Sequence, residues 1–99
     1  MNMQALMKQA QAMQKEISVA KEEINNTNFE GVSSLITVVV NGNKEILKVT
    51  LSPEIKDAID DLSMIEDMIA LAIKDAFVKV DKMTEEKLGK YANMMSGIM

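Results

Sequence analysis

The sequence predicts an α+β fold in which a long helix, a short three-stranded antiparallel sheet and a second long helix follow one another. Three observations predict this order. Apolar residues recur with helical spacing over residues 3–24, alternate with polar ones over residues 35–51, and return to helical spacing over residues 63–88. A chain of 99 residues fits one domain, so we treat residues 1–99 as a single unit.

The composition restricts the classes of function open to the chain. Cysteine and histidine are both absent, which excludes disulfides, thiol chemistry and Cys/His zinc sites. The uncharged run Val32–Asn43 is too short and too polar to cross a bilayer, and the N-terminus lacks the pattern of a signal peptide. We therefore expect a soluble, cytoplasmic protein without a cofactor and without contact to a membrane.

Residues 3–24 are predicted to form one amphipathic helix. An apolar side chain stands at every seventh position, and a second apolar row is offset from it by three residues, as in the a and d positions of a heptad repeat. The two rows are Met3, Ala10, Ile17 and Ile24, and Leu6, Met13 and Ala20. Asn2 is suited to cap the start of this helix, and Asn25 and Asn26 are suited to end it.

Three strands are expected after this helix, at about residues 28–32, 35–40 and 44–51. Asn41-Gly42 is a favoured two-residue hairpin turn, which would place Val38 opposite Glu45. A three-residue loop would instead bring two lysines beside the valines of the apolar face, at a high cost in desolvation. The sequence therefore favours the two-residue loop.

A second long helix is predicted over residues 63–88. Ser63 and Glu66 have the spacing of a capping box, which indicates the start of the helix. Lys87 interrupts the apolar stripe, and Gly89 lowers the helix propensity. We therefore expect residues 89–99 to form a mobile tail.

The lengths of the two helices favour a homodimer with projecting helices. They would measure about 33 and 39 Å, whereas a compact domain of this size is about 34 Å across. A small sheet cannot cover both helices, so their apolar stripes would meet a second subunit. The alternative is a monomer whose two helices pair over the sheet.

Catalysis and metal binding find little support in the residues. Adjacent carboxylates such as Glu22-Glu23 and Glu85-Glu86 point about 100° apart on a helix, so they do not converge on one substrate atom. The acidic residues near Asp57 lack the spacing of a calcium loop. We expect no enzymatic activity, no metal site and no small-molecule substrate.

Two short regions of positive charge stand out in a chain with a net charge of −4. Residues 1–15 and 87–99 contain lysine and no acid. The candidate contacts for an anionic partner in these regions are Gln4, Lys8, Gln11, Lys15, Lys87 and Lys90. The first four share one helical face and could contact phosphates and base edges, although a solvated helix face explains the same spacing.

The chain resembles the YbaB/EbfC nucleoid-associated family over nearly its whole length. Six pieces occur in matching order, and together they carry the resemblance. They are Leu6–Lys15, Glu30-Gly31, Val40-Asn41-Gly42, Leu51–Glu54, Met64–Ile69 with Ala72-Ile73 and Asp75-Ala76, and the late Glu86–Gly89 with Met95-Ser96-Gly97.

This resemblance implies a homodimer joined through the sheets, with long helices that project as a pair of tweezers. It implies binding to duplex DNA, largely through the backbone and with little sequence preference, and an influence on nucleoid organisation and gene expression. The two positive regions would then lie at the free tips of the helices. A protein-interaction module with an acidic surface and no DNA binding is the alternative.

Overall fold

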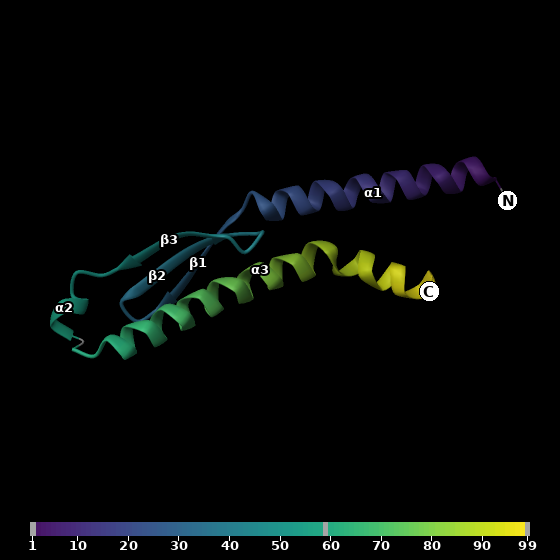
Figure 1. Ribbon diagram of the computed structural model, residues 1–99. Coiled ribbons are helices and arrows are strands. Elements are labelled where there is room, and N and C mark those ends of the chain that lie inside the picture. The colour runs from purple at the N-terminus through teal and green to yellow at the C-terminus, as the bar shows by residue number, and fades with distance from the viewer. Residues whose placement is uncertain (1, 59, 99) are drawn as a thin grey trace.

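The computed structural model describes residues 2–58 and 60–98, with side chains described as far as Tyr91. The elements are α1 (Met3–Asn25), β1 (Asn28–Ser33), β2 (Ile36–Asn41), β3 (Ile46–Leu51), α2 (Ile55–Ala58) and α3 (Leu62–Ile98). The predicted α+β order of helix, three strands and helix is therefore confirmed (Figure 1). Among the described residues, no helix is both long enough and apolar enough to span a membrane.

The molecule is elongated because its two long helices extend beyond the sheet. The sheet is antiparallel with the strand order β1-β2-β3, and α3 packs on β1 and β2. Helix α1 and the C-terminal part of α3 leave the sheet towards the same end of the molecule (Figure 1). The radius of gyration is 19.7 Å, whereas a compact domain of this size would have about 13 Å.

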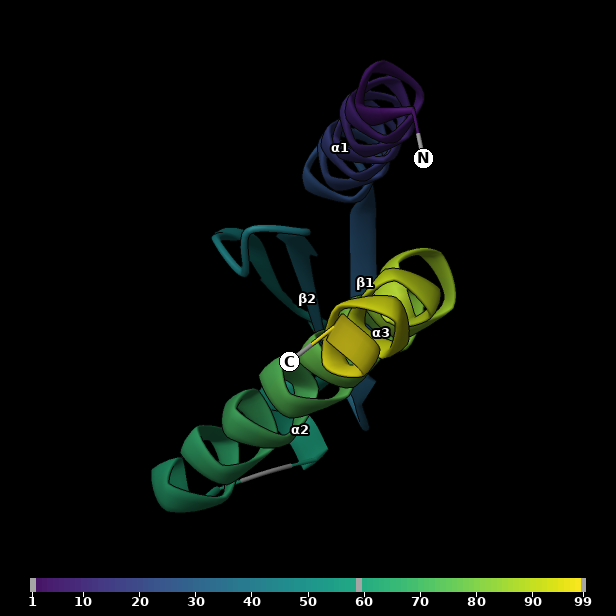
Figure 2. The same ribbon diagram turned by 90° about the vertical axis from the view of Figure 1, so that its right-hand side faces the viewer.

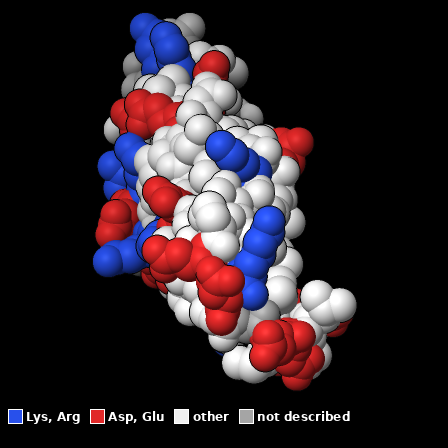
Figure 3. All heavy atoms as spheres, turned by 90° about the vertical axis from the view of Figure 1, so that its left-hand side faces the viewer, with Lys and Arg blue, Asp and Glu red and all other residues white. Residues whose placement is uncertain are grey.

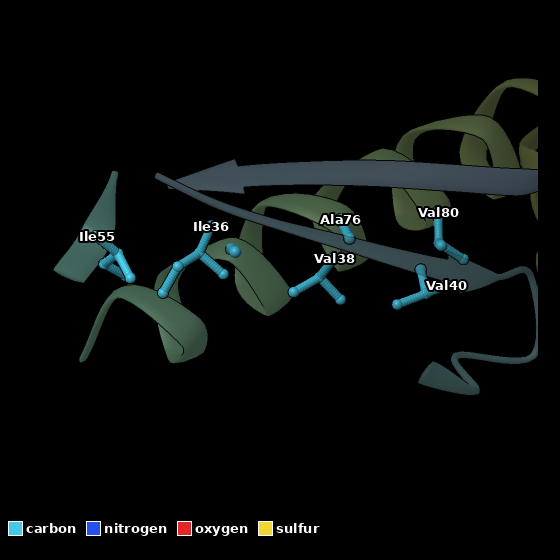
Figure 4. Packing of buried hydrophobic residues seen from close by; sticks show 7 residues of the cluster. Ile36, Val38, Val40, Ile55, Ala76 and Val80 are labelled. Atoms are coloured by element: carbon cyan, nitrogen blue, oxygen red, sulfur yellow. The ribbon is translucent and has the colours of Figure 1, made fainter. Parts of the chain in front are cut away.

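The core lies between β2 and α3. Alternate residues of β2 point towards the helix, so Ile36, Val38 and Val40 are fully buried. Figure 4 shows these side chains packed against Ala76 and Val80, with Ile55 of α2 closing one end. The core is thus a single layer of aliphatic side chains.

Strand β1 and helix α3 touch through their backbones at Gly31. A Cβ atom added to Gly31 would lie 2.0 Å from the carbonyl oxygen of Ala72 and 2.8 Å from the Cβ of Ala76. Glycine in a strand interior marks such a close approach. The small residues at this crossing therefore set the distance between the sheet and α3.

The hairpin loop differs from the predicted one. The N–H of Asn41 donates to the oxygen of Glu45 (3.1 Å), and Lys44 adopts a left-handed φ of 61°. The loop therefore contains three residues, Gly42 to Lys44, and the expectation of a two-residue turn at Asn41-Gly42 was wrong. A three-residue loop of this kind ends in a left-handed residue, a position that Lys44 fills here.

A β-bulge keeps the apolar residues of the hairpin on one face despite the longer loop. Val40 lies opposite Ile46, but the next pair shifts by one residue on β3 and leaves Leu47 unpaired. Val38 then lies opposite Val49, whereas the prediction had placed it opposite Glu45. The cost predicted for a three-residue loop does not arise, because the pairing of β2 with β3 shifts by one residue at the bulge.

Both ends of α3 also differ from the predicted ones. The side chain of Asp61 caps the start, since it accepts hydrogen bonds from the Ser63 hydroxyl (2.8 Å) and the Ser63 N–H (2.9 Å). These bonds lower the pKa of the Asp61 carboxyl. At the other end the helix continues past Gly89 to Ile98, so the predicted end at residue 88 and the tail over 89–99 were wrong. The hydrogen bond of Tyr91 to Glu16 of α1 supports the continuation, because a tertiary contact can outweigh the low propensity of one glycine.

The outer edge of β1 is covered by two side chains of α3. The N–H of Val32 donates to Asp75 (3.0 Å), and the ammonium of Lys79 donates to the carbonyl oxygen of Glu30 (2.6 Å). The bond from Val32, and then the charge of Lys79, lower the pKa of Asp75 from its ordinary value of 3.8. Within residues 2–58 and 60–98, β3 has no strand on its outer side.

Substitution of two glycines tests the close approach. We expect Gly31→Ala to lower the free energy of unfolding by about 3 kcal/mol, because the new methyl group meets backbone atoms that cannot move aside. Gly89→Ala is the matched control, since its Cβ would lie 3.8 Å from the nearest atom and alanine favours a helix. It should raise the stability by about 1 kcal/mol. Urea denaturation measures both changes, and equal effects at the two positions would contradict this explanation.

Candidate nucleic-acid interface

Helix α1 is an arm that the rest of the chain supports at its base. In α1, all of whose residues are described, Ile24 near the C-terminal end is the buried residue. The hairpin tip packs closely there, because a Cβ on Gly42 would lie 2.1 Å from the carbonyl oxygen of Ile24. At the free end of the arm, Met3 and Leu6 are exposed.

The predicted polar stripe lies on the outer face of this arm. Its members Gln4, Lys8, Gln11 and Lys15 are all exposed. At 3.6 residues per turn they lie on the side of the helix opposite to Leu6, Ala10 and Met13, which face α3 across a groove. The stripe therefore points away from α3.

A groove of about 560 Å³ separates α1 from the end of α3. Tyr91 lies on its α3 side and is 8% exposed. The hydroxyl of Tyr91 donates a hydrogen bond to the carboxylate of Glu16 on α1 (3.0 Å). This bond joins α1 to the projecting C-terminal part of α3, which is the second arm. Figure 2 shows the two arms apart when the molecule is viewed from their free ends.

The two candidate lysines of α3 differ from those of α1 in their surroundings. Lys87 forms an ion pair with Glu23 of α1 (2.9 Å) and is 36% exposed. Lys90 lines the groove, and its ammonium lies 4.9 Å from the centre of the Tyr91 ring. The charge of Lys87 is thus compensated within the chain, and the charge of Lys90 lies on the side of α3 that faces the groove.

The structure divides the six predicted residues between two surfaces. The four residues of α1 share its outer face, whereas Lys87 and Lys90 lie on the side of α3 that meets α1. Sequence reasoning missed Glu16, Glu23 and Tyr91, which hold the arms together. The seven-residue spacing of Glu16 and Glu23 on one helical face was a signal that could have revealed them.

The opposite end of the molecule offers no continuous basic surface. Figure 3 shows acidic and basic side chains intermixed over the end that carries α2. Among the residues that the structure describes, no group of three or more acidic side chains could hold a metal ion. The outer face of α1, which has no acid among its four stripe positions, is the better candidate for an anionic ligand.

Comparison with known proteins decides the family. The family model described as "YbaB/EbfC DNA-binding family" matches residues 1–95. The chain belongs to this family. A nucleoid-associated protein of Lactococcus lactis subsp. cremoris is 42% identical over 93 residues, which cover 92% of this chain and 93% of the relative. A nucleoid-associated protein of Enterococcus faecalis is 38% identical and covers 97% of this chain and 93% of its own length.

A solved structure is similar to the YbaB/EbfC fold of this chain. The crystal structure of an uncharacterized protein from Helicobacter pylori superposes with a TM-score of 0.69 and covers 96% of this chain and 98% of its own. The two sequences are 21% identical, so this likeness shows the fold alone. The family expected from the sequence motifs is confirmed by the family model and by the relatives.

Removing the Tyr91 hydroxyl tests the link between the arms. Tyr91→Phe keeps the ring and loses the bond to Glu16, so we expect the free energy of unfolding to fall by about 1 kcal/mol. Amide hydrogen exchange along the free part of α1 should become several-fold faster, because the arm loses a fixed contact. Lys90→Ala is the control, since it leaves the hydrogen bond in place. Unchanged exchange in α1 of Tyr91→Phe would show that the bond does not hold the arm.

Proposed function

We propose that this chain is a nucleoid-associated homodimer that binds duplex DNA mainly through the phosphate backbone and with little sequence preference. It would act at the nucleoid in the cytoplasm, affecting nucleoid organisation and gene expression, without a cofactor. The observation that carries this proposal is the exposed row of Gln4, Lys8, Gln11 and Lys15 on an arm that stands clear of the sheet. The names of the relatives, which describe nucleoid-associated proteins, support it.

The spacing of the row suits contact with the backbone of a duplex. Lys8 and Lys15 are separated by seven residues, or about 10 Å along a helix, which corresponds to about three base-pair steps. Lysine supplies charge for phosphate oxygens, and the glutamine side chains that alternate with the lysines supply hydrogen-bond donors. Contacts of this kind position a protein on DNA without reading its sequence.

A homodimer is supported by the exposed apolar surface of β3. All residues of this strand are exposed, and the apolar ones, Ile46, Leu47, Val49 and Leu51, are between 41% and 52% exposed. Helix α3 covers β1 and β2 but leaves β3 bare, although Val49 and Leu51 share the face of the buried Val38 and Ile36. Apolar surface on an open strand edge favours pairing with a second copy.

The ion pair of Lys87 makes the expected dependence of affinity on salt shallower. If the two stripe lysines of each subunit all contact phosphates, the slope of log affinity against log salt would be about −4. Full participation of Lys87 and Lys90 would make the slope about −7. The shallower value is expected, because Lys87 must first leave Glu23.

Charge reversal on the arm tests DNA binding. We expect Lys8→Glu combined with Lys15→Glu to abolish binding to random duplex DNA at near-physiological salt, because attraction to phosphate becomes repulsion. Gel-shift titration measures the affinity, and the dimer should persist. Lys56→Glu makes a charge change of the same kind on α2, away from the arms, and should have little effect. Unchanged affinity in the double variant would contradict the arm as the contact, and no binding by the wild type would favour a protein-interaction module.

A charge placed on β3 tests the homodimer. Val49→Lys should convert the dimer to a monomer of 11.0 kDa, because two ammonium groups would be buried in the shared surface. Light scattering after size exclusion gives the mass. Thr50→Lys lies on the opposite face of the strand and serves as the control. A wild type that is monomeric at high protein concentration would overturn the proposal.

A further inference from the structure

The outer face of α3 carries a row of exposed apolar side chains that the fold leaves unused. Met64, Leu71 and Val78 follow one another at seven-residue intervals and are 49%, 56% and 56% exposed. Successive members differ by about 20° around the helix, so they form one strip about 21 Å long. Single exposed apolar residues are normal on a surface, but a row at seven-residue intervals corresponds to one of the two apolar rows by which helices pair.

Charged residues beside this row are arranged for an antiparallel partner. Asp67 and Lys74 flank the row on the same side, seven residues apart, and both are exposed. Neither forms an ion pair within residues 2–58 and 60–91.

We propose that this row is a second self-association surface, on which α3 of one homodimer packs antiparallel against α3 of another. A two-fold axis at Leu71 places that residue against its copy and Met64 against Val78 of the other chain. The same axis sets Asp67 beside the other chain's Lys74, and Lys74 beside the other chain's Asp67. A parallel two-fold pairing would instead put Asp67 and Lys74 of the two chains on opposite sides of the contact, so these charges would not meet.

This surface deepens the proposed function and rests on it. A protomer with two different two-fold interfaces, one through β3 and one through α3, joins dimers into larger assemblies. The strip is small, because three apolar side chains per helix cover far less than the roughly 1,200 to 2,000 Å² of a stable interface. The contact is therefore weak in solution and becomes populated where DNA holds dimers side by side at a high effective concentration.

Substitution at the centre of the row tests the surface in solution. Leu71→Glu places two carboxylates against each other, so association of dimers should weaken at least tenfold in sedimentation experiments at high protein concentration. Ala70→Glu makes the adjacent exposed residue equally acidic but lies about 100° away from the row, and it should associate as the wild type does.

A charge exchange tests the antiparallel geometry independently of the apolar row. Asp67→Lys should weaken association, because it then faces Lys74 of the other chain. Adding Lys74→Asp restores opposite charges in both pairs and should restore association. If the double variant stays as weak as the single one, the antiparallel arrangement is wrong.

Binding to DNA of two lengths separates this inference from the proposed function. On a duplex that holds one dimer, Leu71→Glu should bind with wild-type affinity, whereas on a long duplex its Hill coefficient should fall towards one. Wild-type association and cooperativity in Leu71→Glu would overturn the second surface. If Leu71→Glu becomes a monomer while Val49→Lys stays a dimer, the row is the homodimer interface, and both assignments of the two surfaces are overturned.

Discussion

The close approach of β1 to α3 at Gly31 is the constraint on which the rest of the structure depends. Where Gly31 meets Ala72 and Ala76, no side chain separates the strand from the helix. This proximity brings α3 near enough for Asp75 and Lys79 to reach the edge of β1. It also presses α3 onto the aliphatic residues of β2, which form the core.

Periodicity in the sequence was sufficient to predict the elements and their order, because each element has an apolar face of its own spacing. It was not sufficient for the ends and the register. The bulge at Leu47 changes the register within one strand, and the alternation of side chains cannot reveal an extra residue that restores the same faces. The continuation of α3 depends on Tyr91, which contacts a helix far away in the sequence.

In the candidate interface, too, the local pattern could be predicted and the long-range contacts could not. The stripe from Gln4 to Lys15 is a local pattern on one helix, so its common face could be predicted from spacing alone. The pairing of Lys87 with Glu23 joins residues that are 64 positions apart, and charge counting along the chain treats such a lysine as free. Net charge at the chain ends therefore overstated the positive surface that α3 offers.

The two edges of the sheet are not equivalent. Asp75 and Lys79 cover the edge at β1, whereas the edge at β3 is open among the described residues. A sheet with two open edges can add further copies indefinitely, as in fibrils. When one edge is covered, pairing of two copies through their open edges leaves neither copy with a free edge. Growth by strand addition would then stop at two copies, which would protect the protein from β-aggregation.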